Sequence, residues 1–206
     1  MDESGEYLPP FLRRQMSWDD RWRRPEFDPP WKSEILDPAI REAIDDGWFH
    51  GRNLLDVGCG DGAVTVQLVS RGSRVTGIDF SPHAIARARK RWSQVEGVDF
   101  QVRDAIFPWV PPQAFDAILD RGCVQEFDAE MREAYLRNLH AWTAPGCRLL
   151  LLMRCPPVEA QAKTLEIRQL FAGRFAVTDA RSTFMGDQAP DKRIPGLVFR
   201  LLRAEP

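Results

Sequence analysis

Buried-strand and amphipathic-helix patterns alternate along most of this chain. Between the strand-like runs, apolar residues recur at the three- and four-residue spacing of a helix, for example over residues 82–92 and 131–142. Strands that alternate with helices predict an α/β, doubly wound, Rossmann-like fold, with a mostly parallel sheet and helices on both faces. The short apolar runs typical of buried strands are residues 54–57, 74–79, 98–102, 115–120 and 148–153.

The two ends of the chain depart from this alternation. Residues 1–30 are rich in Pro, Arg and Trp without clean periodicity, so we expect a lid or strap on a domain formed by residues 31–206. Two further apolar runs near the C-terminus predict a closing antiparallel pair, which gives a seven-stranded sheet with the last strand antiparallel. These runs cover residues 175–178 and 196–202, and further helices are predicted over residues 35–48, 63–70 and 158–171.

A glycine-rich turn follows the first predicted strand. Its pattern is Asp56-x-Gly58-x-Gly60-x-Gly62, and glycines let the backbone come close to a ligand. Asp79 ends the next strand, where its carboxylate can accept hydrogen bonds from both hydroxyls of a ribose. The turn and the acid together predict a site for an adenosine-bearing cofactor.

The spacing of the glycines indicates which cofactor. Dinucleotide-binding folds use G-x-G-x-x-G, which places a pyrophosphate on a helix N-terminus, and Asp56 would repel that group. The pattern instead resembles motif I of the class I S-adenosylmethionine (SAM) methyltransferases, whose cofactor carries a cationic amino acid. The resemblance covers most of the chain and implies SAM as cofactor. A plain doubly wound domain and a dinucleotide oxidoreductase are the alternatives.

The resemblance also assigns residues to the cofactor. It implies that Asp79 binds the ribose, that Asp104 and the Ala105 backbone bind the adenine edge, and that Asp120 lies by the methionine part and the reaction centre. For each acid the alternative is a cap on a turn at the end of a strand. The other cofactor candidates are Trp18, Trp22, Trp31, Asp56, Gly58, Cys59, Gly60 and Phe80.

Two segments narrow the family. Residues 115–123, in which Asp-Arg-Gly follows the fourth strand, resemble the thiopurine and thiol S-methyltransferase group. Residues 18–22 and 29–31 resemble that group's tryptophan-bearing N-terminal segment, which folds over the cofactor. The sulfonium of SAM is a cation that favours aromatic faces, which gives Trp18 and Trp22 a role in binding it. The alternative is that these tryptophans form a hydrophobic strap packed on the sheet. Substrate identity does not carry over, because residues 125–126 occupy the stretch where relatives vary most.

Candidate catalytic groups are few. None of the three histidines follows the fourth or fifth strand, and no clustered metal-ligand set is visible. An acceptor that ionises easily is therefore favoured, such as a thiol with a pKa near ~8.5. The candidates are Asp120, Arg121 as the group that stabilises an anion, and Glu126 as a weak base. For Arg121 the alternative is a salt bridge to Asp120 or another acid.

Composition limits the partners. The 206 residues fit one domain, and a net charge of -2 gives no global attraction to nucleic acid or anionic lipid. The four cysteines form no C-x-x-C pair, which favours a cytoplasmic location. Residues 28–31 spell a motif of adenine amino-methyltransferases, but residues 23–27 cannot form the buried strand that it requires. We expect a small-molecule acceptor, no nucleic acid and no membrane; the oligomeric state is open.

Two alternatives to this activity remain. One is an O- or N-methyltransferase that tailors a metabolite. The other is a non-catalytic SAM-binding protein that acts as a sensor or partner subunit.

Overall fold

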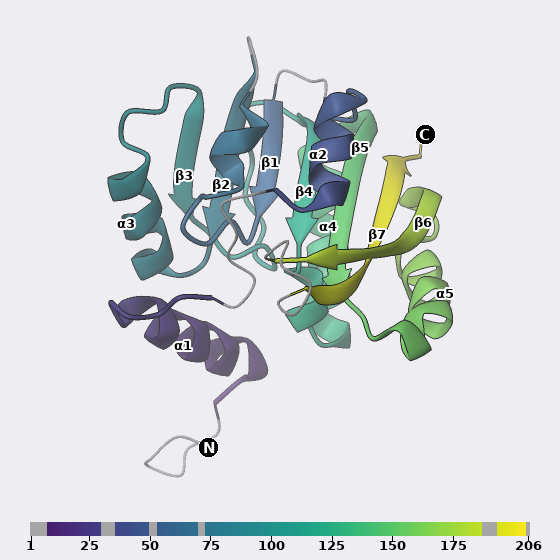
Figure 1. Cartoon of the computed structure of the whole chain (residues 1–206), viewed down its shortest axis with the longest axis horizontal. Coiled ribbons are helices and arrows are strands. Elements are labelled where there is room, and N and C mark those ends of the chain that lie inside the picture. Colours follow the sequence, from purple (N-terminus) through teal and green to yellow (C-terminus); the bar gives the residue numbers. More distant parts are fainter. Residues whose placement is uncertain (1–7, 30–35, 50–52, 70–72, 187–192, 205–206) are drawn as a thin grey trace.

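The computed structural model describes residues 8–29, 36–49, 53–69, 73–186 and 193–204. Its centre is a seven-stranded sheet of order β3-β2-β1-β4-β5-β7-β6 (Figure 1). Strand β7 runs antiparallel to both β5 and β6, and the other pairs are parallel. The predicted sheet with a reversed last strand is therefore confirmed. The strands are β1 (Asn53–Val57), β2 (Arg74–Asp79), β3 (Val98–Val102), β4 (Phe115–Arg121), β5 (Thr143–Arg154), β6 (Phe175–Met185) and β7 (Ile194–Arg203).

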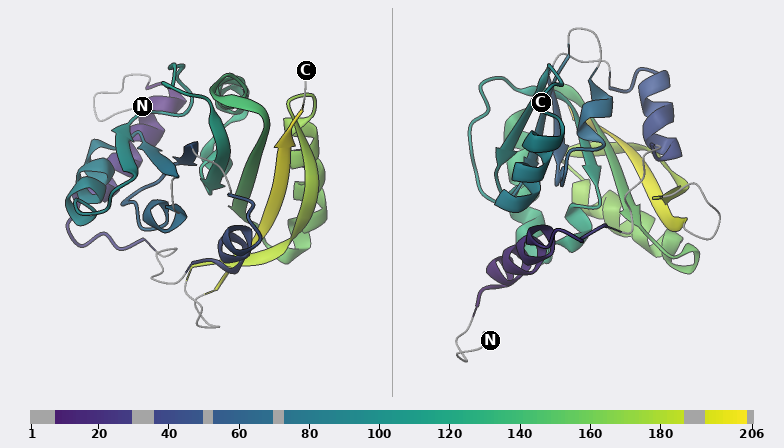
Figure 2. Two further views of the ribbon diagram at one scale, coloured as in Figure 1. Left: turned by 90° about the horizontal axis from the view of Figure 1, so that it is seen from above. Right: turned by 60° about the vertical axis from the view of Figure 1, so that its left-hand side comes forward.

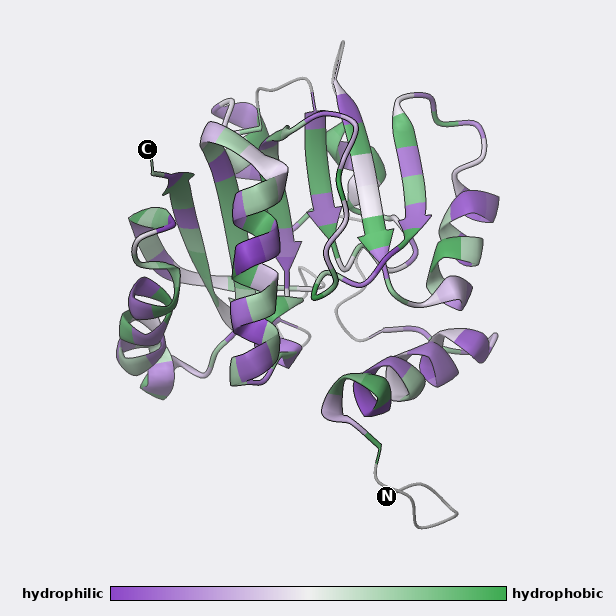
Figure 3. Ribbon diagram, turned by 180° about the vertical axis from the view of Figure 1, so that it is seen from behind, coloured by the Kyte–Doolittle hydropathy of each residue, from purple (hydrophilic) through white to green (hydrophobic). Residues whose placement is uncertain are grey.

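Helices cover both faces of this sheet (Figure 2). Helix α2 (Pro38–Asp45) packs on one face, where Ile40 joins the apolar cluster of Leu54 and Leu150. Helices α4 (Ala129–Trp142) and α5 (Ala160–Phe171) pack on the other face. Helix α3 (Pro82–Arg91) flanks β3, and Ser81 caps it by accepting a hydrogen bond from the amide of Ala84. The middle of the sheet is hydrophobic, in contrast to the mainly hydrophilic first helix (Figure 3).

Two predicted helices are shorter than expected. Instead of a helix over residues 63–70, the structure has a 3₁₀ turn, η1 (Thr65–Leu68). Three consecutive β-branched residues, Val64 to Val66, are stiff at χ1 and disfavour a longer helix there. The helix expected over residues 35–48 is α2, which begins at Pro38 because proline fits a first-turn position. Two further 3₁₀ turns are η2 (Val124–Glu126) and η3 (Pro157–Glu159).

The N-terminal segment contains an element that its irregular pattern did not predict. Helix α1 (Pro10–Arg23) lies below the carboxyl ends of the parallel strands (Figure 1) and packs against α3. Within the described part of the chain, no helix has the length and apolarity needed to cross a membrane. The sheet thus presents its ligand-binding edge, the carboxyl ends of its strands, to α1.

Candidate functional site

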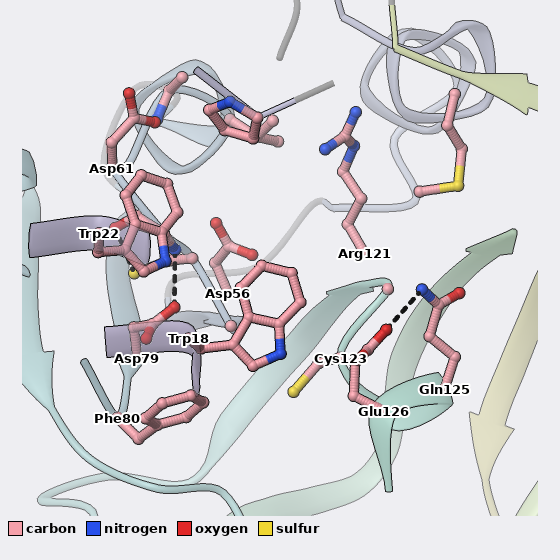
Figure 4. A pocket seen from close by; sticks show the side chains of 18 of the residues that line it. Trp18, Trp22, Asp56, Asp61, Asp79, Phe80, Arg121, Cys123, Gln125 and Glu126 are labelled. Atoms are coloured by element: carbon pink, nitrogen blue, oxygen red, sulfur yellow. Dashed lines mark hydrogen bonds between the residues drawn. The ribbon is translucent and has the colours of Figure 1, made fainter. Parts of the chain in front are cut away.

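A cavity lies where the carboxyl ends of β1, β2 and β4 meet α1 (Figure 4). Asp79, Phe80 and Trp22 gather at one end of the labelled group, and Arg121, Gln125 and Glu126 at the other. The residues that line it include Arg14, Trp18, Trp22, Asp56, Gly58, Cys59, Gly60, Asp79, Phe80, Arg121, Cys123, Gln125, Glu126, Arg154 and Met185. The structure thus brings together most of the predicted site.

The glycine turn leaves no room for side chains. Gly58 and Gly60 have φ angles of 70° and 55°, a region that L side chains rarely adopt. A Cβ on Gly60 would lie 2.9 Å from a ring carbon of Trp22, and one on Gly58 would lie 3.1 Å from the Cβ of Cys123. The bare backbone at these positions is what forms this wall of the cavity.

Asp79 is held at the rim of the cavity by the backbone. Its Oδ2 accepts a hydrogen bond from the amide of Gly60 at 3.0 Å, and its Oδ1 accepts one from the amide of Ser81 at 2.9 Å. Burial raises the pKa of Asp79 to about 6, and the two amide hydrogen bonds oppose that rise. A carboxylate has about four acceptor positions, so two remain for hydroxyl donors in the cavity.

Asp56 lines the cavity from β1 but is also part of the local structure. The hydroxyl of Thr65 donates to its Oδ2 at 2.6 Å. Burial raises the pKa of Asp56 to about 6, while the Thr65 hydroxyl and the charge of Arg121 lower it. Asp56 therefore connects β1 to η1 through this hydrogen bond, and it also lines the cavity.

Asp104 is engaged by α1 rather than open to the cavity. Its Oδ2 accepts hydrogen bonds from Arg14 Nη2 at 2.5 Å and from Gln15 Nε2 at 2.8 Å, and its Oδ1 accepts one from the Ile106 amide at 3.2 Å. Neither Asp104 nor the buried Ala105 is among the residues that line the cavity. The adenine role implied for this pair stays a prediction.

Asp120 lies behind the cavity wall. It is fully buried, and it accepts hydrogen bonds from the Tyr135 hydroxyl at 2.6 Å and from the amide of Cys123 at 2.7 Å. Burial raises its pKa to about 6, against the hydrogen bond from Tyr135. These contacts are those of a residue that caps the turn at the end of β4, which was the alternative for Asp120. They do not support a contact between Asp120 and the reaction centre.

Arg121 lines the opposite end of the cavity. Its Nε donates to the Oδ2 of Asp37, so the ion pair is made with a distant acid and not with Asp120. Asp37 is only 2% exposed and also accepts a hydrogen bond from the Gly186 amide at 2.8 Å. The guanidinium is consequently held at a fixed place in the wall.

Glu126 belongs to a second polar group at this end. Its Oε1 is 2.9 Å from Arg154 Nη2 and accepts a hydrogen bond from Gln125 Nε2 at 3.3 Å. The Oε1 of Gln125 in turn accepts from the Arg154 amide at 2.8 Å. Neither His83 nor His140 lines the cavity, and His50 lies outside the described residues.

The predicted tryptophans differ in their surroundings. Trp18 lines the cavity with Arg21 4.5 Å from its ring centroid, whereas Trp22 is 6% exposed and packs on Gly60. Trp31 lies outside the described residues. Burial raises the pKa of the Cys59 and Cys123 thiols well above the usual range, so both are neutral wall groups.

Among the cavity residues that were not predicted are two that form ion pairs with distant partners. Arg14 and Asp37 meet their partners across 90 and 84 residues of sequence, and neither belongs to a recognisable motif. The only local signal is that Asp37 precedes Pro38, which is typical of a helix start. Such pairs depend on how the helices dock, which a local pattern does not contain.

Several methyltransferases are similar to this chain in sequence. A family model described as a methyltransferase domain matches residues 54–146, which include the glycine turn, Asp79 and Arg121. The 2-heptyl-1-hydroxyquinolin-4(1H)-one methyltransferase of Mycobacteroides abscessus is 31% identical over 127 residues, 61% of this chain and 56% of that protein. Thiocyanate methyltransferase 1 of Arabidopsis thaliana is 27% identical over 158 residues, 72% of this chain and 69% of that protein. The match therefore spans little more than half of the first relative's length.

Solved structures share the fold over nearly the whole chain. One described for the conversion of a disulfide bond into a thioacetal group during echinomycin biosynthesis has a TM-score of 0.77 at 24% identity, covering 92% of this chain and 93% of that one. The N-methyltransferase NodS of Bradyrhizobium japonicum, in complex with S-adenosyl-L-homocysteine, has a TM-score of 0.67 at 19% identity and covers 93% and 98%.

Proposed function

We propose that the chain is a class I SAM-dependent methyltransferase, with SAM as its cofactor, and that it transfers the methyl group of SAM to a small-molecule acceptor. The acceptor atom in this proposal is a thiol or a similarly acidic nucleophile. Residues 1–30 act as a lid on the domain formed by residues 31–206.

The residues present suit this cofactor. Asp79 supplies acceptors for the ribose hydroxyls, and the bare backbone of Gly58 and Gly60 permits close approach. Trp18 offers an aromatic surface that favours a cation such as a sulfonium. Trp22 also lines the cavity and packs on Gly60 of the glycine turn.

The observation that carries the acceptor proposal is the Arg121–Asp37 pair in the cavity wall. A guanidinium held there stabilises a negative charge on an acceptor, and a thiol is already partly ionised near neutral pH. Glu126, a carboxylate that lines the same cavity, is engaged with Arg154, which makes it a weak base. An aliphatic alcohol would need a stronger base than these groups provide.

The residues of this site act by positioning. When bound, SAM would supply a methyl group on a sulfonium as the leaving thioether's substituent, and Asp79 and the glycine turn would hold it for displacement by the acceptor. Orientation of two reactants is worth roughly 7–11 kcal/mol in well-arranged systems. Asp79 and the glycine turn position SAM. Arg121 and the Gln125–Glu126–Arg154 group line the place of the methyl acceptor.

An acidic hydroxyl on a heterocycle is the second candidate acceptor. A relative that shares 31% identity is named for methylation of a hydroxyquinolinone, and such an acceptor is also an anion stabilised by arginine. Acceptor panels separate the two candidates. With radiolabelled SAM, we expect methylated product from thiols and thiocyanate at higher kcat/KM than from phenols, hydroxylated heterocycles or ring nitrogens. Thiols that stay unlabelled while another class turns over would overturn the acceptor proposal.

A further inference from the structure

The guanidinium of Arg14, a residue of α1 that lines the cavity, occupies a space bordered by two aromatic rings. Its guanidinium carbon lies 4.6 Å from the ring centroid of Phe80 and 4.9 Å from that of Phe127. Its Nη2 donates to the Oδ2 of Asp104, and the side chain is only 8% exposed. A planar group is thus held against aromatic rings with one donor directed at a carboxylate.

Adenine has the same recognition chemistry as this guanidinium. It is flat, it stacks on aromatic rings, and its exocyclic amino group is a donor that a carboxylate accepts. The space also adjoins the ribose-binding position, because Phe80 directly follows Asp79 and both line the cavity. The contacts of Arg14 therefore indicate that this space suits a planar hydrogen-bond donor such as adenine.

We propose that Arg14 occupies the place of the cofactor's adenine ring and competes with it for Asp104, so that cofactor binding displaces the Arg14 side chain. This inference rests on SAM as cofactor and is independent of the acceptor. In this proposal Arg14 lowers the affinity for the cofactor as long as its side chain occupies the adenine position.

The contacts of α1 suit such a displacement. The Nε of Arg14 is buried without a hydrogen-bond partner, so the side chain is not fully satisfied where it lies. Elsewhere α1 is anchored independently, since Asp19 accepts a hydrogen bond from the Ser81 hydroxyl at 2.5 Å and lies 2.9 Å from His83 Nδ1. Trp22 adds its packing on Gly60. Arg14 can leave Asp104 while the rest of α1 stays docked.

Calorimetric titration with S-adenosylhomocysteine tests this proposal. Removal of a competing arrangement raises the fraction of competent molecules, so we expect Arg14→Ala to lower Kd about three- to tenfold. Arg13→Ala is the matched control, because Arg13 is the exposed neighbour on the same helix, and in the described contacts its side chain bonds only the Leu8 carbonyl, at 3.0 Å. We expect its Kd to match that of the wild type.

A double-mutant cycle separates competition for Asp104 from a general loosening of α1. In an Asp104→Ala background, Arg14→Ala should change Kd by less than about twofold, because the contested carboxylate is gone. Thermal melting verifies that each variant is folded, and Arg14→Gln replaces Arg14→Ala if the latter is not. An Arg14 variant that binds S-adenosylhomocysteine no better than the wild type overturns the proposal. Failure of the wild type to bind would instead refute the cofactor.

Discussion

The carboxylate of Asp37 accepts a hydrogen bond from the Nε of Arg121 across 84 residues of sequence. Asp37 stands just before α2, and Arg121 is the last residue of β4. The pair therefore joins a helix start to a strand end at the wall of the cavity. Since Asp37 is also fixed by the Gly186 amide, it determines where the guanidinium lies.

Replacement of Arg121 should affect turnover more than cofactor binding. Arg121→Lys keeps the charge but loses the planar fork that Asp37 holds, so we expect kcat for a thiol acceptor to fall about 10- to 100-fold. The Kd for S-adenosylhomocysteine should stay within about twofold. Steady-state kinetics and calorimetry measure the two values. A large loss of cofactor affinity with unchanged kcat would show that the ion pair is purely structural.

Asp79→Asn should weaken cofactor binding. A hydrogen bond to a charged group contributes roughly 1.5–3 kcal/mol, so we expect Kd for S-adenosylhomocysteine to rise about 10- to 100-fold. Asp99→Asn, at an exposed carboxylate on the neighbouring strand β3, is the control. Because the pKa of Asp79 is raised to about 6, affinity should also fall as the pH drops below that value. An Asp79→Asn protein with wild-type affinity would exclude the ribose role.

Gly60→Ala should damage the site beyond its cost in backbone strain. The added methyl group would lie 2.9 Å from the Trp22 ring, at a φ of 55°. Gly173→Ala is a matched control, since Gly173 has a φ of 79° but no atom within 4 Å of the added Cβ. Left-handed backbone alone costs roughly 1–2 kcal/mol, so Gly173→Ala should lose about that much stability and keep cofactor binding. Equal effects of the two changes on Kd would contradict this view of the turn.

Asp120 should make stability depend on pH. Its pKa is about 6 in the folded protein against 3.8 as the reference, so between these values the folded state holds more protons than the unfolded state. Stability therefore falls as pH rises from about 4 to 6, by about 3 kcal/mol for a shift of 6 − 3.8 ≈ 2.2 pKa units. Asp120→Asn removes this titration.

Urea denaturation at pH 4.5 and pH 7 measures the effect. The difference in unfolding free energy between the two pH values should be smaller for Asp120→Asn than for the wild type. The other titrating groups, His140 among them, are common to both proteins. The charge of Asp120 also raises the pKa of Asp56, so its removal lowers that pKa and acts in the same direction. An identical difference in both proteins would show that Asp120 does not titrate in this range.

The sequence predicted those parts of the site that depend on local pattern. The glycine turn and Asp79 are recognisable because a strand, a tight turn and a strand end follow each other within a short stretch. The helix expected over residues 63–70 was wrong, since β-branched residues and the Thr65–Asp56 hydrogen bond favour a 3₁₀ turn.

The hydrophobic pattern of the sequence did not predict in which direction the side chains of Asp120 and Asp104 point. Asp120 sits at a strand end as expected, but its carboxylate turns inward to cap the turn at Cys123 and Val124. Asp104 meets α1 because that helix docks below the strands, and no periodicity marked residues 10–23 as helical. Both features depend on tertiary packing between segments distant in sequence.

The most direct test of the proposed reaction compares two acceptors that differ in one atom. With radiolabelled SAM at neutral pH, benzenethiol and phenol are supplied separately and kcat/KM is measured for each. We expect a kcat/KM for benzenethiol at least about tenfold that for phenol, because the thiol is ionised and the phenol is not. Phenol methylated at the higher rate, with benzenethiol inert, would contradict it.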